Sequence, residues 1–333
     1  MIPDESTAIV VVNYDGFDDT RRCLRSIAAI EDPSVAAIVI DNGSEVDPIA
    51  ALSEEFPWCL AERLSSNTGW SGGNNAGIRL ALDYGAKRII LLNNDTTVHP
   101  HLVDRLIAAG RANPDFGVIG PVICFMDEPD AVMTDGCVFN RPDERGFFQR
   151  KAVPLGDIPE ITEVDIVNGC CMMVDARVVR SIGLIDERFF LIHEESDYCL
   201  RARRAGFRCG VLNDALVWHK GSSSFQRVGG RVQRYYDSRN LFLLLRKHAG
   251  DTAEGRRRAG SSWIEYAKYI YYRYCIEREH EQVEAADAVL EGLCDALTYR
   301  FGGRRSGTRL AAPALRWVFE GVRKNYSRNT VSI

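Results

Sequence analysis

Apolar β-type runs alternate with amphipathic helical patterns throughout the first half of the chain. Three runs stay almost entirely apolar up to their last residue, at 8–13, 36–41 and 88–93. Helical patterns separate and follow them, at 20–30, 49–55, 73–84 and 101–112. Buried strands separated by helices are typical of a parallel sheet whose two faces are both covered. The alternation therefore predicts an α/β fold built on a mostly parallel sheet.

Polar clusters stand at the end of each of these runs. The first run ends in Asn13, Tyr14 and Asp15, and the second continues as DNGS (41–44). The third run stops in the polar residues 93–95. In open α/β sheets, ligands bind outside the carboxyl ends of the strands. We therefore expect these clusters to share one edge of the sheet and to form the functional site.

The second half of the chain is less regular. Strand patterns occur at 117–123, 169–174, 207–212 and 215–219. Helical patterns occur at 178–183, 195–206, 234–248 and 262–298. The stretches 125–159 and 220–230 have the composition of loops. We therefore expect the end of the chain to be a helical region.

Composition and charge restrict the class of protein. The formal net charge is −5, yet the segment from Lys247 onward carries 15 Lys and Arg against 11 Asp and Glu. This basic tail suits either an anionic partner, such as a membrane surface, or a solvated helical face. No stretch reaches the ~18 apolar residues that span a bilayer, and the N-terminus lacks a signal-peptide pattern. We expect a cytoplasmic chain with reduced cysteines and no nucleic-acid partner.

Common nucleotide and metal signatures are missing from the sequence. No GxxxxGK[ST] pattern occurs, which excludes a P-loop, and the Gly-rich stretch 67–77 lacks GxGxxG spacing. His193 is followed by two glutamates but not by the second histidine of an HExxH zinc motif. The candidates that remain are carboxylates and one histidine at strand ends and loop junctions.

Asp41 and Asp95 each end an apolar run. The Asp41 carboxylate can accept hydrogen bonds from a base or a ribose, and its alternative role is that of an Asx-turn residue. Asp95 suits a hard divalent cation that keeps waters and shares ligands with a diphosphate. Its alternative role is the N-cap of the helix near Pro100. His219 precedes a Gly/Ser-rich loop and is either a ligand or an ordinary structural histidine.

Glu194, Glu195 and Asp197 crowd the start of a predicted helix. Acids at this position complement the helix dipole, which is the simplest interpretation. Three acids within four positions exceed what a cap needs, however, and one of them can act as a general base.

Together these motifs resemble family 2 inverting glycosyltransferases with a GT-A fold, most closely their rhamnosyltransferase-like branch. In chain order the motifs are VVNYDG, DNGS, NTGWSGGNNAG, LLNNDTTV, NGCCMMV, FFLIHEESDYCLRARRAG and VWHKGSSS. The match starts near residue 7, and YYDSRNLFLLLRKH (235–248) extends it. The resemblance implies a Rossmann-like, mixed but mostly parallel sheet flanked by helices over residues 1–250. Residues 251–333 would then form a helical region for acceptor, membrane-surface or oligomer contact.

The resemblance implies a role for each motif around the nucleotide. The Asp41 position contacts the base, and Asn13 and Tyr14 border the nucleotide. The Gly-rich segment closes over the ribose and the diphosphate through Asn67, Gly69, Trp70, Gly72 and Asn75. The D-x-D element of the family falls on residues 93–95, so Asn94 and Asp95 lie at the diphosphate. Asp95 and His219 would coordinate Mg²⁺ or Mn²⁺.

The E-D-x-D element of the family falls on residues 194–197. Its second acid is commonly the catalytic base, which points to Glu195, with Glu194 as the alternative and Asp197 as a further catalytic candidate. Two positions depart from the family pattern. Asn93 replaces the first acid of D-x-D and leaves the metal one anionic ligand fewer. Glu195 stands where the family usually has aspartate.

The resemblance also implies substrates and a mechanism. The donor would be a dTDP- or UDP-sugar, with L-rhamnose as a candidate sugar, and the acceptor a cell-wall, polysaccharide or polyprenyl-diphosphate-linked glycan. A carboxylate takes the acceptor proton, and a divalent cation neutralises the leaving diphosphate, so that one displacement inverts the anomeric carbon. The alternatives are a non-catalytic nucleotide- or carbohydrate-binding module on the same fold, and a metal-dependent nucleotide-sugar hydrolase.

The C-terminal region carries an aromatic stripe at helical spacing, formed by Trp263, Tyr266, Ile270 and Tyr274. Such a stripe is either a helix-packing core or an interfacial face. Basic clusters at 256–258 and 304–305 suit contact with anionic lipid. We expect peripheral attachment at the inner face of the plasma membrane, and a second copy of the chain is a further candidate partner.

Overall fold

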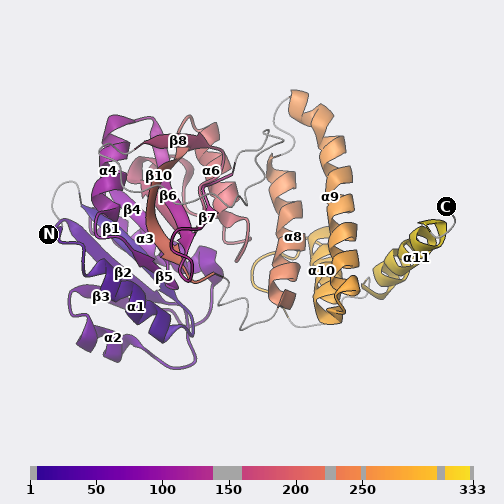
Figure 1. Ribbon diagram of the computed structural model, residues 1–333, viewed down its shortest axis with the longest axis horizontal. Coiled ribbons are helices and arrows are strands. Elements are labelled where there is room, and N and C mark those ends of the chain that lie inside the picture. Colours follow the sequence, from indigo (N-terminus) through magenta and orange to yellow (C-terminus); the bar gives the residue numbers. More distant parts are fainter. Residues whose placement is uncertain (1–5, 138–159, 222–229, 249–252, 306–311, 331–333) are drawn as a thin grey trace. The chain divides into compact units, whose positions relative to one another are not determined.

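The computed structural model describes residues 6–137, 160–221, 230–248, 253–305 and 312–330 (Figure 1). The chain forms two compact units. The first comprises Met1–Glu187 and Glu194–Ser223, and the second comprises Arg188–His193 and Ser224–Ile333. The expected boundary at residue 250 therefore falls inside the second unit, because helix α8 (Gly230–His248) packs with the helices that follow it. Parts of the two predicted loops, 138–159 and 222–229, lie outside the described residues.

One sheet organises the first unit. Its strands are β1 (Thr7–Asn13), β2 (Val35–Asp41), β3 (Cys59–Arg63), β4 (Arg88–Asn93), β5 (Thr96–Val98), β6 (Phe116–Phe125), β7 (Val132–Thr134), β8 (Ile161–Val164), β9 (Cys171–Asp175) and β10 (Arg208–His219). Their order is β3-β2-β1-β4-β9-β6-β10-β5, with β7 paired to β6 and β8 paired to β10. The first four are mutually parallel, whereas β9 runs antiparallel to β4 and β6. The predicted mixed, mostly parallel sheet is confirmed.

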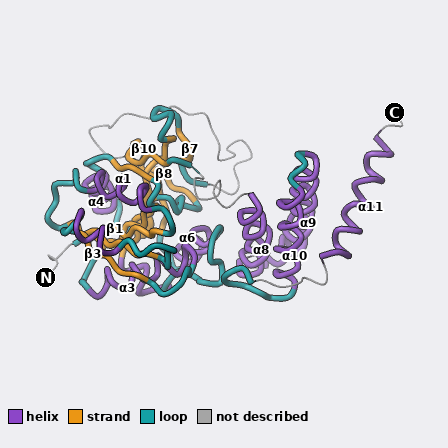
Figure 2. Tube along the Cα trace, turned by 90° about the horizontal axis from the view of Figure 1, so that it is seen from below, coloured by secondary structure: helices purple, strands orange, loops and turns teal. Residues whose placement is uncertain are grey.

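Helices flank the sheet of the first unit (Figure 2). They are α1 (Phe17–Ile27), α2 (Ile49–Glu55), α3 (Gly69–Asp83), α4 (Leu102–Ala112), α5 (Ala176–Ile182) and α6 (Glu194–Arg204). Successive side chains of a strand point to opposite faces of the sheet. Val10 of β1 accordingly belongs to the buried cluster that contains Ile78 of α3, and Val11 to the cluster that contains Leu24 of α1. Burial on both faces explains why the strand sequences are almost continuously apolar.

Helix α3 begins at Gly69 rather than at residue 73, where the sequence pattern placed its start. Asn67 Oδ1 accepts a hydrogen bond from the Gly69 N–H at 2.8 Å, and the positive φ of 75° at Gly69 favours glycine. A Cβ on Gly77 would lie 2.1 Å from Cγ1 of Val10. The glycines therefore form the face through which α3 lies against β1, and they hold the start of the helix at the sheet edge.

Some strands differ from those predicted from the sequence, and the reasons can be identified. The unpredicted strands β3, β5, β7 and β8 are short, and several of their side chains are exposed or half-buried. Strand β10 is continuous although its sequence predicts two strands, because the polar residues Asn213 and Asp214 interrupt the apolar run. Asp214 is buried in an ion pair with Arg105 at 2.5 Å, and the ladder with β6 shifts register beside it.

The second unit contains α8, α9 (Ala253–Glu279), α10 (Val283–Leu297) and α11 (Ala312–Thr330), of which α8, α9 and α10 lie side by side (Figure 1). The single helix predicted over 262–298 is wrong, because the chain turns near Glu281, whose φ is 60°. Tyr266, Ile270 and Tyr274 of α9 are buried in one cluster with apolar residues of α10. The aromatic stripe is thus a helix-packing core. None of the helices in the described part of the chain is long and apolar enough to cross a membrane.

Candidate active site

The ends of β1 and β2 are tied together by their polar residues. Asn13 lies opposite Asp41 in the parallel ladder, and its Nδ2 donates to Asp41 Oδ1 at 2.8 Å. Asp41 is fully buried and also accepts from the Ser44 backbone N–H at 3.3 Å, while Arg63 approaches within 3.6 Å. The turn role is therefore present in the structure. The role of Asp41 in contacting a nucleotide base stays a prediction.

Asn42 is a positioning residue that sequence reasoning missed. Its Oδ1 accepts from both the backbone N–H and the hydroxyl of Thr68, each at 2.9 Å, and its Nδ2 donates to the Gly69 carbonyl at 3.0 Å. These bonds tie the Gly-rich turn, with the predicted residues Asn67 and Gly69, to the end of β2. Asn42 belongs to the DNGS motif, but asparagine is an ordinary turn residue there, so the motif does not indicate these contacts.

Other residues of the predicted nucleotide set have different surroundings. Asn75 is buried and clamps the chain at Ile185, donating to the Ile185 carbonyl at 2.9 Å and accepting from its N–H at 3.0 Å. These contacts favour a structural role for Asn75. Asn94 donates to the Thr20 hydroxyl at 3.0 Å, at the sheet edge. Tyr14 is 48% exposed and remains available to a ligand.

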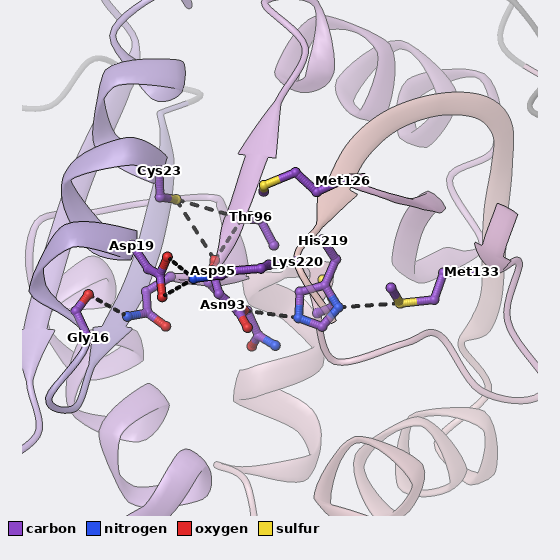
Figure 3. A network of polar contacts seen from close by, with 12 residues as sticks. Gly16, Asp19, Cys23, Asn93, Asp95, Thr96, Met126, Met133, His219 and Lys220 are labelled. Atoms are coloured by element: carbon purple, nitrogen blue, oxygen red, sulfur yellow. Dashed lines mark hydrogen bonds and ion pairs between the residues drawn. The ribbon is translucent and has the colours of Figure 1, made fainter. Parts of the chain in front are cut away.

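Asp95 and His219, the two predicted metal ligands, meet at this edge (Figure 3). His219 Nε2 lies 2.9 Å from Asp95 Oδ1. The antiparallel pairing of β5 with β10 sets Thr96 opposite His219, and the Lys220 N–H donates to the Asp95 carbonyl at 3.0 Å. The N-cap role considered for Asp95 is wrong, because α4 begins at Leu102 with His101 in the cap position.

The Asp95–His219 pair fits a divalent cation that takes its remaining ligands from outside the chain. A carboxylate oxygen and an imidazole nitrogen are both ligands of Mn²⁺, and Mg²⁺ accepts the carboxylate. Within the described residues, no third histidine, cysteine or acid completes a group able to hold a metal alone. Diphosphate oxygens and waters would have to supply the other positions, as is usual for Mg²⁺ at phosphate sites.

Lys220 is a second residue that the sequence did not single out. Its Nζ donates to Asp19 of α1 at 2.9 and 3.3 Å (Figure 3). Asp19 is buried, so this ion pair ties the residue after His219 to helix α1. The pair contributes to holding His219 beside Asp95 at the sheet edge.

Asn93 does not face the Asp95–His219 pair through its amide oxygen. Asn93 Oδ1 accepts a hydrogen bond from Trp70 Nε1 at 2.9 Å, and the Asn93 carbonyl accepts from the Thr96 hydroxyl at 2.7 Å. The residue that replaces the first acid of D-x-D therefore joins the end of β4 to the Gly-rich segment.

The three acids at the start of α6 have different environments. Asp197 is fully buried and accepts from Arg201 Nε at 2.9 Å. Arg201 in turn donates to the carbonyls of Ile182 and Leu184, at 2.7 and 2.9 Å. These contacts favour a structural role for Asp197 rather than the predicted catalytic one.

Glu195 is half-buried and lies beside Gly169 of the NGCC motif, near Trp70. A Cβ on Gly169 would lie 3.3 Å from both Glu195 Cβ and Trp70 Cζ2. Glu194 is buried, and its Oε2 has no hydrogen-bond partner among the residues that the structure describes. Burial, and then the charge of Glu195, raise the pKa of the Glu194 carboxyl well above its ordinary value. Of the two glutamates, Glu195 is the one that solvent can reach.

Relatives of known activity match most of the chain. The hexosyltransferase Agl10 of low-salt glycan biosynthesis in Haloferax volcanii is 28% identical over 72% of this chain and 75% of its own length. The dTDP-rhamnosyl transferase RfbF of Shigella flexneri is 26% identical over 72% and 79%. The N-acetylglucosaminyl-diphospho-decaprenol L-rhamnosyltransferase of Mycobacterium tuberculosis is 24% identical over 73% and 85%.

Solved structures of other proteins share the fold described above. TarS 1-349 of S. aureus in complex with UDP-GlcNAc superposes with a TM-score of 0.56 at 15% identity, over 88% of this chain and 81% of TarS. The mannosyltransferase PcManGT of Pyrobaculum calidifontis in complex with GDP-Man and Mn²⁺ gives 0.54 at 10% identity, over 87% and 86%. The family model described as glycosyltransferase like family 2 matches residues 3–238. The chain is therefore a member of glycosyltransferase family 2, and its fold is GT-A.

Proposed function

We propose that this glycosyltransferase is metal-dependent and inverting, and that it transfers a hexose, with L-rhamnose as the first candidate, from a dTDP- or UDP-sugar. The acceptor would be a glycan, free or linked to a polyprenyl diphosphate. The observation that carries the proposal is the meeting of Asp95 with His219, 2.9 Å apart, at the carboxyl edge of the sheet. The relatives that transfer rhamnose, one of them to a decaprenyl-diphosphate-linked sugar, support the choice of substrates.

The residues of the chain divide the chemistry between them. Asp95 and His219 would hold Mg²⁺ or Mn²⁺, which when bound supplies positive charge to the leaving diphosphate. Glu195 would accept the proton of the acceptor hydroxyl as its oxygen forms a bond to the anomeric carbon and the bond to the diphosphate breaks. Displacement from the face opposite the leaving group inverts that carbon. Glu194, whose pKa is raised by burial and by Glu195, is less suited because it is buried.

A non-catalytic binding module and a nucleotide-sugar hydrolase are the competing functions. A decayed site would have no reason to keep a carboxylate and an imidazole in contact, or a solvent-accessible glutamate beside the Gly-rich segment. A hydrolase differs from a transferase only in using water as the acceptor. The structure of the site therefore argues against the module, while the hydrolase must be tested by kinetics.

Calorimetry against dTDP-rhamnose, UDP-GlcNAc and GDP-mannose, with and without Mn²⁺, is the first test. We expect one sugar nucleotide to bind, and Mn²⁺ to strengthen its binding. Rates of nucleoside-diphosphate release are then compared with and without a polyprenyl-diphosphate-linked GlcNAc acceptor. Faster release with acceptor supports transfer. Release that is equally fast in water alone supports the hydrolase, and binding without release supports the module.

We further propose that the second unit contacts an anionic membrane surface from the cytoplasmic side. The basic clusters do not carry this proposal, because Arg304 is held by Glu291 at 2.5 Å and the side chains of 256–258 lie outside the described residues. Helix α11 carries it instead. Leu315 and Phe319 pack on the helical core, while Trp317 is 80% exposed.

The chemistry of α11 suits a lipid surface better than a second protein chain. Val318 and Val322 are also exposed, so an apolar face is turned to solvent. The sequence of the helix, APALRWVFEGVRKNYSRNT, contains four basic residues and one acid. Two of the basic residues are paired, Arg316 with Asp287 at 2.7 Å and Arg323 with Glu320 at 3.0 Å, so the lipid contact depends on the remaining positive charge of the helix. Exposed tryptophan and valine with an excess of positive charge are typical of helices that lie in the interface of an anionic bilayer. Helix α11 of a second copy of the chain would carry the same positive charge, so two such helices would not be complementary in charge.

A further inference from the structure

The Trp70–Asn93 hydrogen bond lies at the position of the first acid of the D-x-D pattern. The indole Nε1 of Trp70 donates to Asn93 Oδ1 at 2.9 Å, and both residues are half-buried. An indole offers one donor and no acceptor, so a buried one is satisfied only by an acceptor in the right place. Asn93 supplies this acceptor without a charge.

Trp70 is held on a second side by the NGCC turn. A Cβ on Gly169 would lie 3.3 Å from Trp70 Cζ2, which is the ring atom next to the Nε1 edge. The turn is itself fixed, because Asn168 Oδ1 accepts from the Cys170 N–H at 2.8 Å. The indole edge is therefore confined between Asn93 at the end of β4 and the Gly169 backbone.

The proposed base lies beside the same glycine, close to the same Cβ position as the indole. Glu195 Cβ is also 3.3 Å from the position of a Gly169 Cβ, and Glu195 Cγ is 3.5 Å from it. Asp95, the proposed metal ligand, is two residues beyond Asn93 in the chain. Trp70 is thus hydrogen-bonded to the end of β4, two residues before Asp95, and lies near Gly169, beside which Glu195 also packs.

We infer that Trp70 contacts the transferred sugar, and that Asn93 is the residue that positions its ring. The inference rests on the proposed function. In an inverting transfer, the sugar lies between the leaving diphosphate and the attacking hydroxyl, and Trp70 lies near residues proposed to act at both. The flat apolar surface of an indole suits the C–H face of a hexose, while polar groups around it fix the orientation. A neutral acceptor at position 93 orients this ring without placing a second negative charge beside the diphosphate.

Comparing a sugar nucleotide with its sugar-free nucleotide tests the inference. The probes are dTDP-rhamnose against dTDP and UDP-GlcNAc against UDP, measured by calorimetry in Mn²⁺. We expect Trp70→Leu and Asn93→Leu each to weaken the sugar nucleotide about three- to tenfold, as loss of one oriented contact would. Binding of dTDP or UDP should change less than about twofold, because neither contains the sugar.

Three further variants separate positioning from general damage. Asn93→Asp keeps an acceptor for the indole and should therefore keep the wild-type ratio of sugar-nucleotide to free-nucleotide binding, while the added negative charge weakens both. Trp70→Leu combined with Asn93→Leu should be no worse than Trp70→Leu alone, because Asn93 acts through Trp70. Trp58→Leu is the matched control, since Trp58 is 46% exposed in the turn before β3, outside the site.

Each outcome has one interpretation. Equal losses for the sugar nucleotide and the free nucleotide would overturn the inference and place Trp70 at the nucleotide. An unchanged preference in both leucine variants would overturn it as well. If the wild-type protein binds none of the sugar nucleotides, the proposed function itself is wrong. If the wild-type protein transfers sugar, but both leucine variants keep its preference for the sugar nucleotide over the free nucleotide, only the role of Trp70 and Asn93 is contradicted.

Discussion

Glu195 is the residue on which the proposed chemistry depends most. Glu195→Gln keeps the size of the side chain beside Gly169 but removes its ability to accept a proton. We expect transfer to fall about 10²-fold or more, while Mn²⁺-dependent binding of the sugar nucleotide is unchanged. Initial rates and calorimetry on the same preparation measure both. Glu54→Gln, on the exposed surface of α2, is the matched control. Transfer by Glu195→Gln at the wild-type rate would remove Glu195 from the mechanism.

Glu194 makes a different prediction, for the pH dependence of stability. Its pKa is raised by burial and by Glu195, so the folded protein holds this proton to a higher pH than the unfolded chain does. The stability from the protonated form is fully present below the ordinary pKa of 4.5 and is lost as pH rises through the raised value. Glutamine cannot ionise, and therefore Glu194→Gln should avoid this loss.

Thermal unfolding at several pH values tests the Glu194 prediction. We expect Glu194→Gln to melt about 2 °C or more above the wild type at pH 8, with the difference disappearing near pH 4.5. Glu54→Gln, on the exposed surface of α2, serves as the comparison, because replacing Glu195 would itself remove a charge that raises the pKa of Glu194. A difference between Glu194→Gln and wild type that is the same at both pH values would contradict the raised pKa.

Single residues show how far the sequence could lead. Asp95 and His219 were predictable as a pair because each follows a strand and belongs to a motif with a known role in the family. Asp197 and Asn75 belong to equally recognisable motifs, yet they contact Arg201 and Ile185. Arg201 follows Asp197 by one helical turn, a spacing at which an ion pair is predictable, whereas the Ile185 backbone is 110 residues from Asn75 and no pattern marks it. The indole partner of Asn93 was unpredictable for the same reason.

At the scale of elements, the sheet edge that we propose to bind the metal is a product of strand pairing. Asp95 precedes β5 and His219 ends β10, and the antiparallel pairing of these strands brings the two side chains to 2.9 Å. Asp95→Asn and His219→Gln should each reduce Mn²⁺-dependent binding of dTDP or UDP about tenfold or more. Nucleotide binding without metal should stay as in the wild type.

His101→Gln is the matched control for this proposed metal-binding edge, because His101 is exposed in the cap of α4. Calorimetric titration of the nucleotide with and without Mn²⁺ separates the two contributions. If both variants keep the full strengthening by Mn²⁺, Asp95 and His219 do not hold the metal.

Elements were predictable from the sequence where their burial leaves a recognisable pattern of apolar residues. Strands β1, β2 and β4 are buried on both faces, and their bounds differ from the predicted ones by no more than one residue. The turn between α9 and α10 was not predictable, because helical sequence continues through it. It forms because α10 packs against α8 and α9, which is a tertiary effect. Propensity cannot show where a long amphipathic sequence folds back on itself.

At the scale of the whole molecule, the division into two units could not be read from the sequence. The segment Arg188–His193 belongs to the second unit although residues on both sides belong to the first. Asn240 of α8 donates to the carbonyls of Phe189 and Ile192, each at 2.8 Å, and Arg239 donates to the Phe189 carbonyl at 2.8 Å. Both side chains are fully buried. These bonds explain why the motif FFLIHEESDYCLRARRAG (189–206), which resembles the glycosyltransferase family pattern, begins in the helical unit.

The membrane proposal is also a property of the whole molecule, and Trp317 provides its test. The full chain is sedimented with vesicles of phosphatidylcholine, with and without phosphatidylglycerol. We expect binding only to the anionic vesicles, and a loss of about tenfold when Trp317 and Val318 are both replaced by serine. Because these side chains are exposed, the variant should keep its fold and its melting temperature.

Trp58→Ser controls for the loss of an exposed tryptophan elsewhere, since Trp58 is 46% exposed in the first unit. Raising the salt from 0.1 M to 1 M should release the wild type, because the Debye length falls from about 10 Å to about 3 Å. Equal binding to neutral vesicles would show that charge does not select the surface. A dimer that is lost in the Trp317 and Val318 variant, without any vesicle binding, would assign the α11 face to a second copy of the chain.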